Sequence, residues 1–263
     1  MTYSVMAYEE ATGELGGAFA TAAIGGPRMS PWAHGVFPEY SDAAALVFPH
    51  AASNPGLAHR TFALLDEGRS LGDVEAELVA FDADIEWRQL TVMRPGGEGL
   101  VRTGSSANHY AGDASGPGWI VAGNALAGPE VVDAMVDVIS RDTEQPLAER
   151  LLATVEAGRA AGGQAHPETR EQLPELSGAL YVVDGRSAFP VVDLRVDFDP
   201  DALTQLRKLY EHSKPHAWFF PLGVERPQDV MTEAGRRKAF DPTPLPSGSG
   251  VPNPADRAGE ATA

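Results

Sequence analysis

The chain contains no cysteine, and this absence removes a whole class of chemistry. Without a thiol the protein can have no disulfide bond, no thiolate nucleophile and no thiolate-bound metal. Lysine is almost as scarce, because Lys208, Lys214 and Lys238 are the only lysines among the 20 basic residues. A catalytic role for a lysine before residue 208 is therefore excluded.

Positive charge is scarce overall, since 37 acidic residues stand against 20 basic ones and the formal net charge is -17. An acidic surface repels the phosphates of nucleic acids and anionic lipids, so we expect neither nucleic acid nor membrane as a partner. The chain has no basic amino-terminal region followed by an apolar run. No segment approaches the roughly 20 apolar residues that a transmembrane helix requires. We expect a soluble, cytoplasmic protein.

The signature motifs of several enzyme classes are also missing. The chain has no phosphate-binding loop, no Gly-x-Gly-x-x-Gly fingerprint, no Gly-x-Ser-x-Gly elbow and no His-Glu-x-x-His motif. Its histidines are scattered without ligand spacing, and surface or loop positions explain them better than a metal site. They are His34, His50, His59, His109, His166, His212 and His216. We expect neither a metal nor another cofactor.

The chain does contain an ordered series of strand and helix patterns. Apolar runs and turn signals predict strands over residues 3–8, 15–24, 43–48, 87–93, 99–103, 119–122, 178–183 and 189–196. Helical periodicity with capping signals predicts helices that begin near residues 55, 70, 128, 146 and 201. Because strands and helices occur in groups, an α+β layered domain is favoured over a parallel βαβ sheet.

The pattern changes near the carboxyl end. We predict one domain over residues 1–214 and an extension over 215–240 that packs on the domain or on a neighbouring subunit. Residues 241–263 are rich in proline, glycine and serine with almost no large apolar residues, so we expect a disordered tail.

Thr2 is the residue from which a chemical hypothesis can start. It follows Met1 and opens the alternation of the first predicted strand. Cleavage of Met1 would leave Thr2 with a free α-amine, so that one residue holds a nucleophile and its own general base. An unperturbed α-amine titrates near ~7.7–8.0, which leaves part of it neutral at neutral pH. Taken alone, a Met-Thr start is better explained without any chemistry.

Two strand exits offer polar groups for the same kind of site. Gly123 and Asn124 follow one predicted strand and precede a helix, so that an amide or a backbone N–H there can stabilise an oxyanion. Ser105 follows the strand that ends at Thr103 and can line the same end of a sheet. On the residues alone, an ordinary turn explains both segments better.

Several segments together resemble a known family, the domain-of-unknown-function family 1028. The resemblance extends over about residues 2–213, and Gly123-Asn124-Ala125-Leu126 is its most specific piece. The matching segments are Met1-Thr2-Tyr3-Ser4-Val5, Gly13-Glu14-Leu15-Gly16, Pro31-Trp32-Ala33, Asn54-Pro55 and those at 64–70, 87–90, 122–132, 146–152 and 192–197. This family is grouped with the N-terminal nucleophile (Ntn) hydrolases. The resemblance therefore implies a four-layer αββα sandwich of two antiparallel sheets between helical layers.

The resemblance also implies a reaction. In similar enzymes an N-terminal Thr, Ser or Cys attacks an amide carbonyl, its α-amine acts as the base, and an acyl-enzyme is hydrolysed. Thr2 would be the nucleophile, and Asn124 with the backbone of Gly123 would stabilise the oxyanion. Ser4 lies two residues on and shares the face of Thr2. We expect a homo-oligomer that hydrolyses a small-molecule C–N bond (amide, lactam or ureido) without a cofactor.

The chain departs from the pattern of these relatives. Proteasome-like members of the superfamily have a lysine after the second strand, where this chain offers only Arg28, a cation that cannot accept a proton. The family usually has a Cys-x-x-Trp-Ala-Gly-His sequence where this chain has residues 107–113. These departures keep open a second hypothesis, a non-catalytic, oligomeric protein that binds a small molecule or acts as a scaffold on the same fold.

Overall fold

The computed structural model of the chain describes residues 1–36, 40–141, 144–187, 189–217 and 226–232. Contacts divide the chain into two units, residues 1–212 and 213–263. The second unit includes the 3₁₀ helix Lys214–His216 and helix α7 (Pro227–Met231). The tail predicted over 241–263 lies outside the described residues. No described helix is both long and apolar enough to cross a lipid bilayer.

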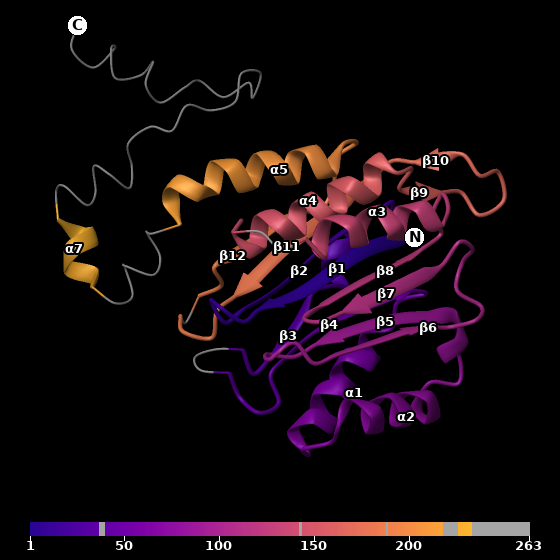
Figure 1. Cartoon of the computed structure of the whole chain (residues 1–263), viewed down its shortest axis with the longest axis horizontal. Coiled ribbons are helices and arrows are strands. Elements are labelled where there is room, and N and C mark those ends of the chain that lie inside the picture. Colours follow the sequence, from indigo (N-terminus) through magenta and orange to yellow (C-terminus); the bar gives the residue numbers. More distant parts are fainter. Residues whose placement is uncertain (37–39, 142–143, 188, 218–225, 233–263) are drawn as a thin grey trace, which may run out of the picture. The chain divides into compact units, whose positions relative to one another are not determined.

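The larger sheet of the first unit has six antiparallel strands in the order β12-β11-β2-β1-β8-β7 (Figure 1). Its centre is a hairpin in which Gly13 has φ 72°, a backbone conformation that glycine adopts without steric cost. The strands are β1 (Thr2–Glu9), β2 (Glu14–Thr21), β7 (Gly112–Gly116), β8 (Trp119–Asn124), β11 (Ser177–Val183) and β12 (Val192–Val196). Thr2 is thus the first residue of a central strand.

A second antiparallel sheet has four strands in the order β3-β4-β5-β6. They are β3 (Trp32–His34), β4 (Ala45–Ala51), β5 (Arg88–Met93) and β6 (Gly99–Thr103). A short two-stranded ribbon joins β9 (Gln164–Ala165) to β10 (Gln172–Leu173). The prediction of antiparallel sheets with grouped strands is confirmed.

Five helices accompany the sheets in the described part of the first unit: α1 (Pro55–Asp66), α2 (Leu71–Phe81), α3 (Pro129–Ile139), α4 (Leu147–Ala160) and α5 (Ala202–Ser213). Their starts follow the predicted signals. The side chain of Asn54 accepts a hydrogen bond from the Gly56 amide at the start of α1, and Ser70 caps α2 through the Asp73 amide. A helix start therefore follows from residues that satisfy its free N–H groups.

Three apolar cores hold these elements together. One lies between α3, α4 and α5 and one face of the six-stranded sheet, with Tyr3, Val5 and Leu151 among its members. Another lies between α1 and α2 and the four-stranded sheet. The third lies between the two sheets and includes Met6 and Phe48. Figure 1 shows α3 and α4 beside the six-stranded sheet and α1 and α2 beside the four-stranded sheet.

Small residues in β2 allow the two sheets to approach closely. A Cβ atom added to Gly17 would lie 2.5 Å from Cζ of Phe48, which belongs to the facing sheet. A Cβ atom added to Gly16, on the other face of the strand, would meet Cδ1 of Leu151 in α4 at 2.9 Å. The alanine- and glycine-rich sequence of this strand therefore permits close packing on both of its faces.

Several predicted boundaries are wrong. The strand predicted over 15–24 ends at Thr21, because the chain turns away from the sheet and the Ala22 amide donates to the Gln164 side chain at 2.9 Å. Strands β3 and β7 have no large apolar run to reveal them. Each forms by adding to the edge of a longer strand, β4 or β8.

Candidate functional site

Strand alternation places a set of polar side chains between the two sheets. In β1, Tyr3 and Val5 belong to the helix-side core, whereas Met6 belongs to the core between the sheets, so Thr2 and Ser4 share the face of Met6. The same reasoning brings residues of both sheets to one end of this interface. We call them the inter-sheet polar cluster: Thr2, Ser4, Thr21, His50, Gln89 and Asn124. All except Thr2 are buried.

Thr2 is held between two strands. It is paired with Thr21 of β2 and with Asn124 of β8 in the antiparallel register. Its hydroxyl donates to Oγ1 of Thr21 at 3.2 Å, and Oγ1 of Thr21 donates to the carbonyl oxygen of Met1 at 2.5 Å. The Thr2 hydroxyl therefore has a fixed direction, toward β2.

Thr2 lines a cavity of about 100 Å³ that also contains Met1. Its described lining residues are Met1, Thr2, Phe19, Thr21, Ala23, Gly26, Met29, Ser30, Pro49, His50, Ala51 and Ser53. Burial lowers the pKa of the Met1 amine, because the charged form loses hydration there. The cavity therefore favours an uncharged amine at its wall.

Ser4 and His50 form a buried pair across the two sheets. Oγ of Ser4 lies 2.8 Å from Nε2 of His50, and the tautomer of the ring decides which of the two donates. Burial, and secondarily the positive amine of Met1, lower the pKa of His50 to about 3. The imidazole is therefore neutral at neutral pH. His50 lines the cavity, whereas Ser4 is not among the described residues that do.

Asn124 and Gln89 form a second pair across the sheets. Nε2 of Gln89 donates to the carbonyl oxygen of Gly123 at 3.0 Å and to Oγ1 of Thr103 at 2.8 Å, which fixes the orientation of this amide. Oε1 of Gln89 then accepts a hydrogen bond from Nδ2 of Asn124 at 3.1 Å.

The other end of the Asn124 amide is left unpaired. Its Oδ1 is buried and has no hydrogen-bond partner among the described residues. An unpaired buried acceptor costs roughly 1–3 kcal/mol, so this atom is suited to a donor supplied by a ligand or by a change in the chain.

The family model for a family of unknown function, DUF1028, matches residues 2–206. The chain belongs to the DUF1028 family. It is also similar to the crystal structure of protein SPO2555 from Silicibacter pomeroyi, described by the same family model, with a TM-score of 0.68 and 24% identity. That similarity covers 81% of this chain and 89% of the other, and it indicates a shared fold. No curated protein matches the chain.

The structure brings together only part of the site predicted for this DUF1028 chain. Thr2, Ser4, Gly123 and Asn124 lie together at one end of the inter-sheet interface. Gly123 is flanked by β1 and β7, and its carbonyl oxygen is occupied by Gln89. The Gly-Asn strand exit thus lies beside Thr2, and its role there stays a prediction.

Arg28 and Ser105 lie elsewhere. Arg28 is exposed at the end of the 3₁₀ helix Gly26–Arg28, and it is not among the described residues that line the Thr2 cavity. Ser105 is exposed, and both its amide and its hydroxyl donate to Oε2 of Glu86, at 2.9 and 2.8 Å. These hydrogen bonds lower the pKa of Glu86 and give Ser105 a local structural role.

Three members of the cluster were missed by the sequence prediction: Thr21, His50 and Gln89. The expectation that every histidine is a surface or loop residue is wrong for His50, which is 2% exposed. The missed signal is the alternation of strand faces. His50 follows Phe48 by two residues and Gln89 precedes Met93 by four, so each lies on the same face of its strand as that buried apolar residue. Polar residues in phase with a buried apolar face indicate a polar site inside the fold.

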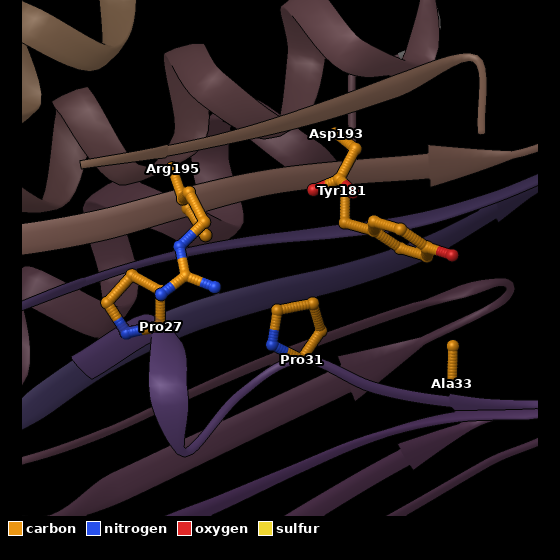
Figure 2. A pocket seen from close by; sticks show the side chains of 7 residues that line it. Pro27, Pro31, Ala33, Tyr181, Asp193 and Arg195 are labelled. Carbon is orange, nitrogen blue, oxygen red and sulfur yellow. The ribbon is translucent and has the colours of Figure 1, made fainter. Parts of the chain in front are cut away.

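A second cavity, of about 200 Å³, lies near the β12 edge of the larger sheet (Figure 2). It is lined by Pro27, Pro31, Ala33, Ala179, Tyr181, Asp193 and Arg195. Figure 2 shows Arg195 reaching toward Pro27. Pro27 and Pro31 line this cavity, whereas Gly26, Met29 and Ser30 line the Thr2 cavity, so residues 26–31 contribute to the walls of both.

Proposed function

We propose that the protein is an Ntn-type amidohydrolase in which Thr2, freed by cleavage of the Met1–Thr2 bond, hydrolyses a C–N bond of a small molecule. The observation that carries this proposal is the position of Thr2. Its hydroxyl lies on a central strand, and the residue lines a cavity that it shares with Met1. Loss of Met1 would leave a free amine and new space at the same point.

The arrangement of the cores supports the Ntn-like form of the fold. Apolar contacts run from α3, α4 and α5 to the six-stranded sheet, then between the sheets, and then to α1 and α2. This order is the one expected of a four-layer αββα sandwich. The nucleophile then lies at the end of the inter-sheet space.

The proposed reaction uses the hydroxyl and the amine of one residue. Oγ1 of Thr2 attacks the carbonyl carbon while its proton passes to the α-amine. The C–N bond breaks, the leaving nitrogen takes that proton, and an ester joins the acyl group to Thr2. Water then attacks the ester with the α-amine as base, which releases the acid and restores Thr2.

Two neighbours support this chemistry. Cleavage removes the Met1 carbonyl that Thr21 Oγ1 now binds, so that this hydroxyl becomes free to donate to Oγ1 of Thr2 or to an oxyanion. Oδ1 of Asn124, which has no partner among the described residues, can accept an N–H from the α-amine. Nδ2 of Asn124 has two N–H donors, which go to Oε1 of Gln89 at 3.1 Å and to the carbonyl oxygen of Thr2 at 3.5 Å, so donation to an oxyanion requires the release of one of these partners.

The engagement of Nδ2 of Asn124 in hydrogen bonds favours a second candidate function. Both donors of the Asn124 amide are already used, by Gln89 at 3.1 Å and by the Thr2 carbonyl oxygen at 3.5 Å, and residues 107–113 differ from the usual family sequence. A small-molecule-binding protein that keeps the fold without turnover fits these features. The homo-oligomeric state remains a prediction under either function.

Intact mass and covalent labelling test the proposal. Mature protein should lack Met1 and should gain the mass of a β-lactone probe at Thr2. Thr2→Ala should abolish labelling, whereas Thr12→Ala, in the exposed turn between β1 and β2, should not change it. Full retention of Met1 on folded protein, or undiminished labelling of Thr2→Ala, would contradict the assignment. Tight ligand binding without turnover and without dependence on Thr2 would support the binding protein instead.

A further inference from the structure

His50 is the one residue with a titratable side chain among the described residues that line the Thr2 cavity. The other lining side chains are apolar or carry hydroxyl groups, and the remaining titratable group is the chain amine at Met1. No lysine and no carboxylate is among these lining residues. Among these lining side chains, His50 is therefore the first candidate for an influence on the protonation of an amine in this cavity.

The imidazole ring of His50 is held in one orientation. Nε2 lies 2.8 Å from Oγ of Ser4, and the ring makes an edge contact with Phe48 at a centroid distance of 5.9 Å. Nδ1 has no hydrogen-bond partner among the described residues. With Ser4 engaging Nε2, Nδ1 is the ring atom available to a group that enters the cavity.

The ring is also close to the amine end of the chain. The positive amine of Met1 contributes to lowering the pKa of His50, and burial contributes more. No other charged group among the described residues that line the cavity faces the ring, whether from β1, β2, β4 or residues 26–30. A neutral imidazole that donates Nε2–H to Ser4 presents a lone pair at Nδ1, which is a hydrogen-bond acceptor.

We propose that His50 is the positioning residue for the α-amine of Thr2, with Nδ1 accepting a hydrogen bond from that amine after the Met1–Thr2 bond is cleaved. This inference rests on the proposed function of Thr2. When Oγ1 attacks, the amine takes the hydroxyl proton and becomes an ammonium, while His50 stays neutral throughout. A charge-assisted hydrogen bond from the ammonium to Nδ1 stabilises the state in which the proton is held. This chain thereby needs no lysine beside its nucleophile.

The pH dependence distinguishes this role from a merely structural one. An acceptor at Nδ1 favours the ammonium form and raises the pKa of the amine, and attack requires the neutral amine. Removal of the acceptor should therefore move the acidic limb of the rate profile to lower pH and also lower the plateau rate. A loss of folded protein would lower the amplitude at every pH without moving the limb.

The test uses full-length protein made behind a cleavable leader, so that cleavage leaves Thr2 as the first residue. We expect His50→Leu to slow β-lactone labelling about 10- to 100-fold, the effect of losing one hydrogen bond to a charged group. His50→Asn, whose Oδ1 can replace Nδ1, should recover most of that loss. His34→Leu, at a half-buried histidine that is paired with Asp66 away from this cavity, should match the parent protein.

The pKa of the α-amine, measured by ¹⁵N NMR on the same proteins, gives a readout that does not need turnover. It should fall in His50→Leu and stay near the parent value in His50→Asn. An unchanged amine pKa in folded His50→Leu would overturn the role of His50, whether or not the protein is labelled. Absence of labelling in the parent, with the expected amine pKa change present, would overturn the hydrolase and leave His50 as the partner of the amine.

Discussion

The carbonyl oxygen of Met1 accepts a hydrogen bond from the Thr21 hydroxyl at 2.5 Å. The Thr21 hydroxyl in turn accepts a hydrogen bond from the Thr2 hydroxyl at 3.2 Å. The Met1 carbonyl thus takes the hydroxyl proton of Thr21, which in the proposed reaction would be donated to Oγ1 of Thr2 or to an oxyanion. The chain of hydroxyl groups ends on a peptide carbonyl that cleavage would remove. The state of the Met1–Thr2 bond therefore decides the hydrogen bonding of both threonines.

Thr21→Val should slow labelling of Thr2 by about 10- to 100-fold in the mature protein, because it removes one donor to a developing charge while keeping the shape of the side chain. Thr91→Val is the matched control. The Thr91 hydroxyl is buried between the same sheets and has no partner among the described residues. That control should label normally and unfold at equal or higher denaturant concentration. Equal labelling rates in the two variants would contradict the role of Thr21.

The burial of His50 should make stability depend on pH. Its pKa is about 3 in the folded protein, below the ordinary value of 6.5, so the unfolded chain binds more protons between these values. The contribution of His50 to the free energy of unfolding should therefore be complete above pH 6.5. It should decrease as the pH drops, by at most ~1.4 kcal/mol per pH unit. Urea unfolding at pH 5.5 and at pH 7 measures how the free energy of unfolding changes with pH. His50→Gln should reduce this change, and an equal change in the variant would contradict the lowered pKa of His50.

Gln89→Leu should destabilise the fold, because it leaves the Gly123 carbonyl and the Asn124 amide without their partner. Each buried group left unpaired costs roughly 1–3 kcal/mol. Chemical denaturation should show the loss, and Gln172→Leu, at an exposed position, should change the free energy of unfolding by under about 0.5 kcal/mol. Equal stability of the two variants would show that the Gln89 hydrogen bonds contribute little.

Gly17→Ala should cost about 1–3 kcal/mol, because the added methyl group would lie 2.5 Å from Cζ of Phe48 between the sheets. Phe48→Leu in the same chain should recover part of the loss by vacating that space. Gly72→Ala provides the control, since its added Cβ meets only Oγ of Ser70, at 3.9 Å, within helix α2. Thermal melting should show the control unchanged or more stable, by up to about 1 kcal/mol.

The sequence predicted those elements that carry their own local signals. Pro129 and Ser70 predict the starts of helices, and the apolar-polar alternation after Thr2 predicts the first strand. The turn at Gly13 follows from the freedom of glycine. The location of Asn124 opposite Thr2 follows once both strand ends are known, since antiparallel partners meet at one end of a sheet.

The remainder of the site depends on contacts between distant segments. His50 meets Ser4 only because β4 and β1 belong to facing sheets, and Gln89 meets Asn124 for the same reason. A strand pattern gives the two faces of a strand but not the sheet that will cover either face. Ser105 shows the converse, since its partner Glu86 lies in the 3₁₀ helix Ile85–Trp87, which no periodicity connects to it.

Residues 26–31 form part of the walls of two cavities, one lined by Thr2 and one lined by Tyr181 and Arg195. A wall that belongs to a connecting segment is independent of the ladder hydrogen bonds that hold the sheets. Its length and composition can therefore change without disturbing the strand pairing of Thr2. A change in this segment would alter the shape of both cavities while the strand ends at Thr2 and Asn124 stay fixed.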